Sequence, residues 1–232
     1  MSTVHFVGGD KGGVGKSVVA RLLVEWCAER QLGFVAVDAD LSNRTLARHY
    51  PASTEVVDLV RLDSADTIFT RAAETERRVV VDLPAQGDGA VAAWMAEGQI
   101  LELAKAAGVE VAFWHVMDDG KDAIAALGRS LGRHRPPVRH VIVENLGRGV
   151  RFALFDQSPA RAAADAAGAR TIQIPELNAA VMRKLDHLDA AFGAAIHDPG
   201  LAADVITRGD RQRVKLWLQA CFAQLARVGD WI

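Results

Sequence analysis

Short hydrophobic runs recur along the chain, and stretches with helical periodicity separate them. Each run is hydrophobic at nearly every position, as expected for a strand that is buried on both faces of a sheet. Parallel strands joined by helices produce this pattern, because each connecting helix covers one face. The chain is therefore predicted to be an α/β protein, a three-layer sandwich in which a mostly parallel sheet carries helices on both faces. The predicted strands are residues 4–9, 34–40, 77–84, 109–118, 138–145 and 169–175.

Two helical stretches frame this pattern. Hydrophobic residues recur at helical spacing over 16–31, and Gly33 is predicted to end that helix. The last long stretch, 210–230, is hydrophobic along one side. We expect that side to pack on the core or on a protein partner, rather than on a membrane as a short amphipathic appendage would. Since no repeat or low-complexity linker interrupts the chain, residues 1–232 are expected to form one domain.

Composition narrows the functional classes only slightly. With 27 Lys and Arg against 29 Asp and Glu, the net charge is -2 at pH 7. Such a chain has no overall attraction for nucleic acid or an anionic membrane. A local basic stretch either binds DNA nonspecifically or, as the balanced charge favours, is an ordinary solvated loop. This stretch contains Arg129, Arg133, His134, Arg135, Arg139 and His140.

The two cysteines favour a reducing compartment, and the histidines give no sign of a metal site. Cys27 and Cys221 lie within hydrophobic helical patterns and are predicted to be small buried residues. His5, His115 and His187 lack the spacing of metal ligands and are expected to be structural. No cationic leader precedes the first strand, and no uncharged run reaches the roughly 18 residues that span a bilayer. The protein is therefore expected to be cytoplasmic.

The stretch GGDKGGVGKS, residues 8–17, connects the first predicted strand to the first predicted helix. In this context a glycine-rich turn is typical of a phosphate-binding loop. Gly12, Gly13 and Gly15 allow the backbone N–H groups to approach an anion, at the positive end of the helix dipole. Lys16 is predicted to contact the β- and γ-phosphates, and the Ser17 hydroxyl to bind Mg²⁺.

The sequence KGGVGKS resembles the deviant Walker A loop of the ParA/MinD-type P-loop ATPases. The resemblance implies that the loop through Val14 and Val18 binds nucleotide. It also implies that Lys11 reaches the phosphates of a second subunit in a nucleotide-sandwich dimer. The chain departs from the standard patterns at two positions: Asp10 replaces the first glycine of the general loop motif, and Val18 replaces a second Thr or Ser of the family. Val18 removes one hydroxyl contact to the nucleotide.

Two acidic residues end the second predicted strand, at the edge where ligands bind in parallel α/β sheets. By resemblance to the switch I segment of the family, Asp38 helps to hold Mg²⁺ through water and Asp40 orients the attacking water. The alternative is a carboxylate that caps a turn or a helix, for which Ser42 and Asn43 stand in suitable positions after Asp40.

A third acidic residue, Asp82, ends the strand VVVDLP and matches the Walker B and switch II pattern of the family. A carboxylate there accepts hydrogen bonds from Mg²⁺-bound water, whereas a lone buried aspartate would be costly. The glycine-containing segment that follows, with Gln86, Gly87 and Gly89, fits a loop that senses the γ-phosphate.

The base of the nucleotide is assigned to two further strand ends. Asn145 follows one predicted strand and Pro175 follows the next. In the family, an asparagine and the backbone around an Ile-Pro dipeptide recognise adenine at these places. Asn145 is equally typical of a plain turn.

Three functional classes share this loop. The resemblance favours an ATP- and Mg²⁺-dependent ATPase that dimerises with ATP, positions or recruits a macromolecular cargo, and hydrolyses slowly until an unidentified protein partner stimulates it. The alternatives are a metal-cluster-delivery ATPase, which needs intersubunit cysteine ligands, and a small-molecule kinase or synthetase, which usually lacks the lysine at position 11. Within the first class, the sequence looks most like the TraL-type proteins of plasmid conjugation, through MDDGKDAIAAL, IQIPEL and TRGDRQRVKLWLQACFAQL.

Overall fold

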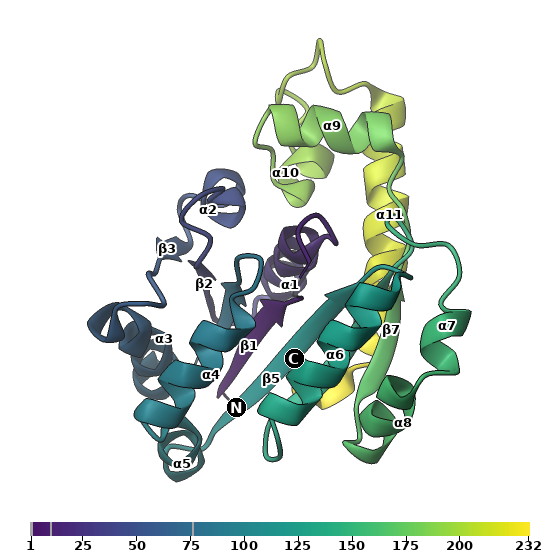
Figure 1. Ribbon diagram of the computed structural model, residues 1–232. Helices are drawn as coiled ribbons and strands as arrows, with labels where there is room; N and C mark the ends of the chain where they lie inside the picture. Colours follow the sequence, from purple (N-terminus) through teal and green to yellow (C-terminus); the bar gives the residue numbers. More distant parts are fainter. Residues whose placement is uncertain (1, 10, 76) are drawn as a thin grey trace.

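One seven-stranded sheet runs through the computed structural model, which describes residues 2–9, 11–75 and 77–232 (Figure 1). All of its paired strands are parallel, in the order β3-β2-β4-β1-β5-β6-β7. The predicted α/β class is therefore confirmed. Asp10, which replaces a glycine of the general motif, lies outside the described residues. The strands are β1 Ser2–Gly8, β2 Phe34–Asp38, β3 Thr54–Val56, β4 Arg78–Asp82, β5 Val109–Met117, β6 Arg139–Asn145 and β7 Arg170–Ile174.

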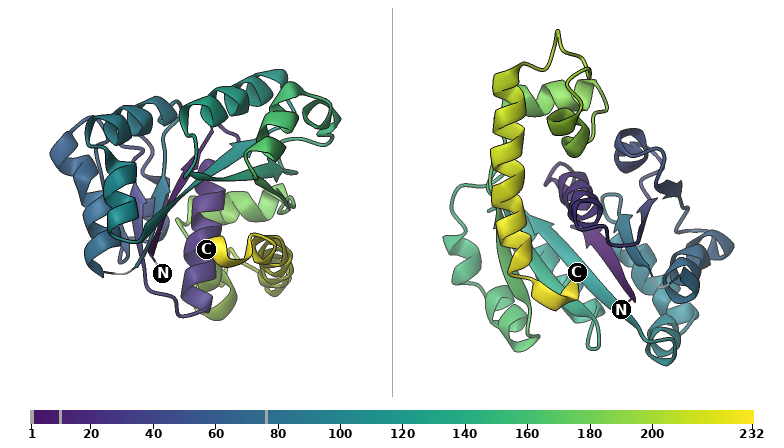
Figure 2. Two further views of the ribbon diagram at one scale, coloured as in Figure 1. Left: turned by 90° about the horizontal axis from the view of Figure 1, so that it is seen from below. Right: turned by 180° about the vertical axis from the view of Figure 1, so that it is seen from behind.

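Helices cover both faces of this sheet, as the pattern predicts (Figure 2). One face carries α1, α9, α10 and α11, and the other carries α3 to α8. The helices are α1 Lys16–Glu29, α2 Thr45–His49, α3 Leu62–Thr75, α4 Asp88–Glu97, α5 Ile100–Ala106, α6 Lys121–Arg133, α7 Ala153–Asp156, α8 Pro159–Ala166, α9 Ala179–His187, α10 Phe192–His197 and α11 Arg208–Ala226, with a final 3-10 turn at Gly229–Trp231.

The continuous hydrophobic runs follow from burial on both faces. In β1, Val4 and Phe6 pack into the core beneath α3, α4 and α5, whereas Val7 packs beneath α1 and α11. Every residue of β1 is buried. Because successive side chains of a strand point to opposite faces, a central strand must be hydrophobic at consecutive positions. The strand β3, three residues long with Glu55 in its middle, lacks this signal and was not predicted.

The end of α1 corrects one prediction. The helix ends at Glu29, and the left-handed residue that reverses the chain is Gln31, with φ 53°, rather than Gly33. The Leu32 N–H then bonds to the Cys27 carbonyl oxygen at 2.9 Å, a closing bond typical of helix C-termini. A non-glycine residue adopts the left-handed conformation at a cost in free energy, so glycine is the residue expected there. The prediction therefore placed the helix end at Gly33 instead of near Gln31.

The last long helix, α11, packs on the core as expected. Its buried side includes Val214, Trp217, Cys221 and Leu225. Its first turn is closed by a capping box, in which Thr207 and Asp210 exchange side-chain and backbone hydrogen bonds. Within the described ranges, no helix combines the length and the hydrophobicity that crossing a bilayer requires.

The two edges of the sheet are unequal in length but both restricted. At one edge, β3 offers only three residues. At the other, the Gln173 N–H of β7 donates to the Gln224 side-chain oxygen of α11 at 3.1 Å. A side chain of α11 therefore occupies a backbone donor that would otherwise face outward from the edge strand.

Candidate nucleotide site

The glycine-rich loop lies between β1 and α1, at the carboxyl edge of the sheet (Figure 1). Gly13 and Gly15 have φ of 79° and 102°, a region that strongly favours glycine. A side chain at position 15 would also collide with Asn145, because a Cβ there would lie 2.3 Å from the Asn145 Nδ2 atom. Around Gly12 and Gly13 there is open space instead. The loop thus leaves its outer backbone accessible, as an anion cradle requires.

Lys16 begins α1 and is buried. Its ammonium group donates to the Lys11 carbonyl oxygen across the loop, at 3.1 Å. This contact holds the positive charge over the loop and beside the helix N-terminus, where anions bind favourably. The predicted loop residues Gly12, Gly13, Val14, Gly15, Lys16, Ser17 and Val18 therefore form one continuous turn into α1.

Asp82 lies between the loop and the second strand end. The register pairs Asp82 of β4 with Asp38 of β2 on one side and with Val7 of β1 on the other. Both Asp82 oxygens are buried without a hydrogen-bond partner of good geometry among the described residues, although the Ser17 hydroxyl lies close enough to favour the charged form. Burial nevertheless raises the pKa of Asp82 to about 7.

This carboxyl group fits a magnesium site. A buried carboxylate with vacant acceptor positions is costly, and water molecules on a bound Mg²⁺ would supply the missing donors. The Ser17 hydroxyl, the other predicted ligand, belongs to the same corner. When bound, the ion would neutralise negative charge on the phosphate oxygens.

The carboxylates of switch I make local contacts. The two oxygens of buried Asp38 accept backbone N–H groups of Asp40 and Ala47, both at 3.0 Å. Burial raises the pKa of Asp38, and these bonds oppose the rise. Asp40 accepts the N–H groups of Ser42 and Asn43, each at 3.1 Å. The capping alternative is therefore observed for both, and their roles toward Mg²⁺ and water stay predictions.

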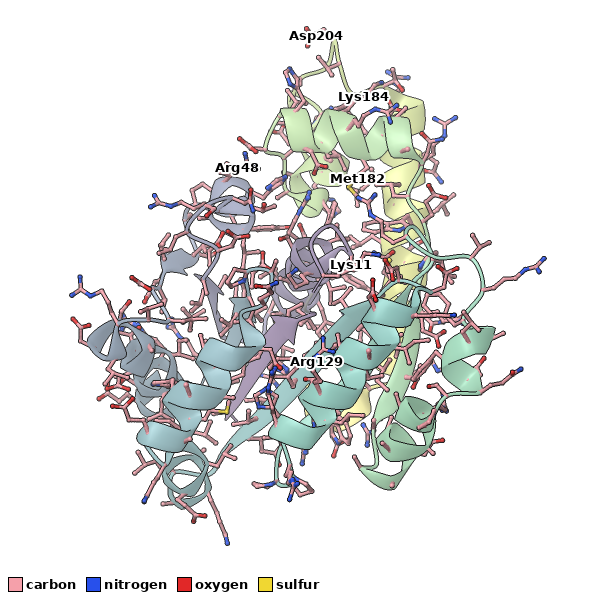
Figure 3. All side chains as sticks on the ribbon, viewed as in Figure 1. Lys11, Arg48, Arg129, Met182, Lys184 and Asp204 are labelled. Carbon is pink, nitrogen blue, oxygen red and sulfur yellow. The ribbon has the colours of Figure 1, made fainter. Side chains whose placement is uncertain are left out.

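Lys11 contacts a residue that the sequence reasoning missed. The ammonium group of Lys11, a residue labelled in Figure 3, lies 2.5 Å from an oxygen of Asp118, which directly follows β5. The Lys11 side chain is 50% exposed and that of Asp118 is 12% exposed. The hydrogen bond and the negative charge of Asp118 raise the pKa of Lys11. Lys11 is thus directed toward α6 rather than back over its own loop. Asp118 and Asp119 at the end of the predicted strand 109–118 could have indicated an acidic partner for Lys11.

Asn145 and Pro175 line one cavity of about 250 Å³ beside the loop. Asn145 donates from Nδ2 to the Val14 carbonyl at 2.7 Å and accepts the Gly147 N–H at 3.0 Å. Asn145 therefore ties this cavity to the phosphate loop. Sequence reasoning missed the wall that α9 and α11 contribute. The lining includes Gly15, Val18, Arg148, Met182, Arg183 and Trp217.

A larger cavity, of about 590 Å³, lies against β7 and α8 and contains none of the predicted site residues. Its polar lining includes Glu144, Asp156 and Arg161. Because no residue of the glycine-rich loop lines the larger cavity, the smaller cavity beside the loop is the better candidate for a nucleotide base.

The basic stretch is tied into the protein rather than being a solvated loop. Arg133 donates to Asp88 at 2.6 Å, and buried His134 also contacts Asp88. Although burial opposes it, these two partners lower the pKa of Asp88. Arg139 pairs with Glu110. Since Asp88 follows Gln86 and Gly87, the stretch anchors the predicted γ-phosphate-sensing segment to α6.

The fold is similar to that of P-loop proteins of the MinD type. The MinD protein complexed with Mg-ADP from Pyrococcus horikoshii OT3 is similar with a TM-score of 0.53 and 16% identity, covering 100% of both chains. The cell division ATPase MinD of Pyrococcus furiosus gives 0.51 and 18%, covering 96% of this chain and 100% of that one. A MinC:MinD complex of Aquifex aeolicus gives 0.53 and 12%, covering 96% of each. The likeness confirms the fold resemblance.

Sequence relatives narrow the resemblance further. Protein TraL of Escherichia coli is 24% identical over 241 residues, covering 97% of this chain and 98% of its own. Protein MobD of Acidithiobacillus ferrooxidans is 27% identical over 182 residues, covering 75% of this chain and 78% of its own. No protein-family model matches the chain. The TraL-like resemblance expected from the short motifs is thereby confirmed.

Proposed function

We propose that this chain is an ATP-binding and ATP-hydrolysing dimerisation switch that positions or recruits a macromolecular cargo. One observation carries the proposal: the buried Asp82 carboxylate, with vacant acceptor positions, lies beside Ser17 and the lysine-bearing loop. A phosphate chain with Mg²⁺ would satisfy both features at once, because it brings anionic oxygens to the loop and water donors to the carboxylate. The similar MinD protein of Pyrococcus horikoshii OT3, which is complexed with Mg-ADP, supports this choice of ligand.

In this mechanism Lys16 and the loop N–H groups bind the β- and γ-phosphates, and Ser17, Asp38 and Asp82 hold Mg²⁺ directly or through water. Asp40 orients the attacking water: its Oδ1 accepts the N–H groups of Ser42 and Asn43, and its Oδ2, which accepts the Asn43 side-chain amide, keeps a lone pair for the water. Lys11 supplies positive charge to the transferring phosphoryl group of a second copy. A cation delivered in this way lowers the barrier only when two subunits meet.

Lys11 is suited to this role by its position. Its side chain is 50% exposed, whereas that of its partner Asp118 is 12% exposed. Because the ammonium group can be reached from outside the subunit, an anion of a second copy can compete with Asp118 for it. An ATP-dependent homodimer follows as the proposed active state.

The cargo is proposed from the relatives. TraL-type proteins belong to plasmid conjugation, so a DNA-transfer complex is the proposed cargo and a protein of that complex the proposed stimulator of hydrolysis. Two observations weaken the alternatives. Cys27 and Cys221 are buried in core helices and cannot reach a cluster shared between subunits. Arg133 and Arg139 are engaged in ion pairs, which reduces the charge available for nonspecific DNA binding.

Nucleotide binding by calorimetry tests the proposal directly. Lys16→Ala should abolish binding of ATP with Mg²⁺, because both the loop charge and the contact to the Lys11 carbonyl are lost. Lys215→Ala, which replaces an exposed lysine on α11, is the matched control and should bind as the original chain does. Equal ATP affinity in Lys16→Ala and Lys215→Ala would refute the assignment of the loop.

A further inference from the structure

The C-terminal helix contributes an indole ring to the wall of the base cavity. Trp217 of α11 lines that cavity together with Pro175, and only 6% of the residue is exposed. Its ring packs edge-on against Phe192 of α10, with centroids 4.9 Å apart. The indole N–H donates to the Pro175 carbonyl oxygen at 2.7 Å. Trp217 therefore does more than fill the core, because its one polar atom is used on a cavity residue.

The Ile174–Pro175 turn is held from two sides. The Leu146 N–H, just after β6, bonds to the Ile174 carbonyl at 2.9 Å. The Trp217 N–H bonds to the next carbonyl along the chain. A proline has no N–H of its own with which to anchor the turn. The orientation of the Pro175 carbonyl thus depends on α11, which is far away in the sequence.

A carbonyl oxygen has two lone pairs, and the indole occupies one of them. We propose that Trp217 is a positioning residue for base selection, holding the Pro175 carbonyl so that its second lone pair accepts a hydrogen bond from the 6-amino group of a purine. The proposal rests on the nucleotide binding proposed above. A 6-oxo purine presents an acceptor at the same place, so an oriented carbonyl would repel it.

The helix that carries Trp217 is itself well anchored. Thr207 caps its start, and Asp210 in its first turn pairs with Lys184 of α9 at 2.7 Å. Helix α9 supplies Met182, labelled in Figure 3, and Arg183 to the lining of the same cavity. Because α9 and α11 are joined and both line the cavity, the indole is held at a fixed distance from the turn.

Calorimetric titration of the full chain with Mg-ATP and with Mg-ITP, which carries oxygen at the 6-position, tests the proposal. We expect the original chain to prefer ATP, and Trp217→Phe to reduce the ATP-to-ITP affinity ratio about three- to tenfold, the scale of one hydrogen bond. Trp26→Phe is the matched control, since Trp26 is a core indole that packs edge-on against Phe222. The control should keep the original ratio.

A second replacement at position 217 separates the effect of the indole N–H hydrogen bond from the effect of ring packing. Benzothienylalanine at position 217 keeps the bicyclic ring and removes only the N–H, so it should reproduce the reduced ratio even if Trp217→Phe fails to fold. Equal weakening of ATP and ITP, or an unchanged ratio in this variant, would overturn the proposal. Binding of inorganic tripolyphosphate distinguishes a failure of base selection from a failure of the proposed nucleotide binding. A chain that binds tripolyphosphate, ATP and ITP alike keeps its phosphate site but refutes base selection, whereas a chain that binds none of them refutes the proposed function.

Discussion

At the residue scale, the most informative side chain is Asp82. Its neighbours in the register, Asp38 and the end of β1, make the corner both buried and acidic. The type and position of Asp82 were predictable from a hydrophobic run that ends in an acidic residue. Its vacant acceptor positions were not, because they depend on how β1, β2 and β4 come together. The Lys11–Asp118 pair was missed for the same reason, since 107 positions separate the two residues.

Asp82 should make the stability of the ligand-free protein depend on pH. Its pKa is raised from 3.8 to about 7 in the folded chain, so the neutral form is favoured by folding. Stability from this group is present in full below pH 4 and is lost as the pH rises toward 7. Asp82→Asn should therefore raise the melting temperature at pH 8 and have a smaller effect at pH 5.

Thermal unfolding without nucleotide or Mg²⁺ measures this difference. Asp63→Asn is the control, because Asp63 is 71% exposed and pairs with Arg61 at the surface. It should change the melting temperature by less than Asp82→Asn at pH 8. If Asp82→Asn lowered the melting temperature equally at both pH values, the carboxylate would have a buried partner that stabilises its charge.

Replacement of Asp40 tests whether this carboxylate takes part in ATP hydrolysis. Asp40→Ala should leave ATP affinity within about threefold and reduce turnover by at least about a hundredfold, since general-base or orienting groups contribute on that scale. Asn43→Ala removes a partner of Asp40 and retains the carboxylate, so it should remain active. Phosphate release under saturating ATP is the measurement, and undiminished turnover in Asp40→Ala would refute the assigned role.

At the scale of elements, burial determined which helices and strands could be predicted from the sequence. The strands β1, β2, β4, β5 and β6 were predicted from consecutive buried hydrophobic residues and β7 from a shorter hydrophobic pattern, while the short β3 was not predicted. The end of α1 was misplaced because Gln31, an ordinary residue, adopts the left-handed conformation. The contribution of α9 and α11 to the base cavity was hidden, because Met182 and Trp217 look like ordinary core residues of amphipathic helices. Periodicity identifies the buried side of a helix but not the cavity that it lines.

The cap of α11 gives a prediction about stability. Thr207→Ala removes the hydroxyl that accepts the Asp210 N–H at 3.1 Å, and should lower the free energy of unfolding by about 1 kcal/mol. Thr207→Ser keeps the hydroxyl and should cost less than half as much. Denaturant unfolding followed by circular dichroism measures both. A loss as large in Thr207→Ser as in Thr207→Ala would show that the methyl group, and not the cap, is responsible.

At the scale of the whole molecule, the features proposed to bind ligand gather at the carboxyl edge of the parallel strands, as expected for this architecture. The phosphate loop, the acidic corner, the base cavity and Lys11 all lie there. That concentration was predictable from strand ends alone. The prediction that residues 1–232 form one domain stays a prediction, although a single sheet joins the first strand to the last.

Dimerisation is the prediction that belongs to this scale. With a nonhydrolysable ATP analogue, light scattering should detect a dimer of the original chain and only monomers of Lys11→Ala. Asp118→Asn frees the Lys11 ammonium from its charged partner, so it should lower the dissociation constant of the dimer by up to about fivefold. A dimer of Lys11→Ala as tight as that of the original chain would contradict the proposed role.

The side-chain clamp between Gln224 and the Gln173 N–H has a consequence for higher-order assembly. Sheet proteins that leave a long border unprotected tend to extend by adding strands from neighbouring copies. Here one border is only a three-residue strand, and a helix of the same chain has already taken up a donor of the other. Polymers that grow sideways by β-strand addition are therefore disfavoured, which agrees with the proposed closed dimer through the face that carries the glycine-rich loop.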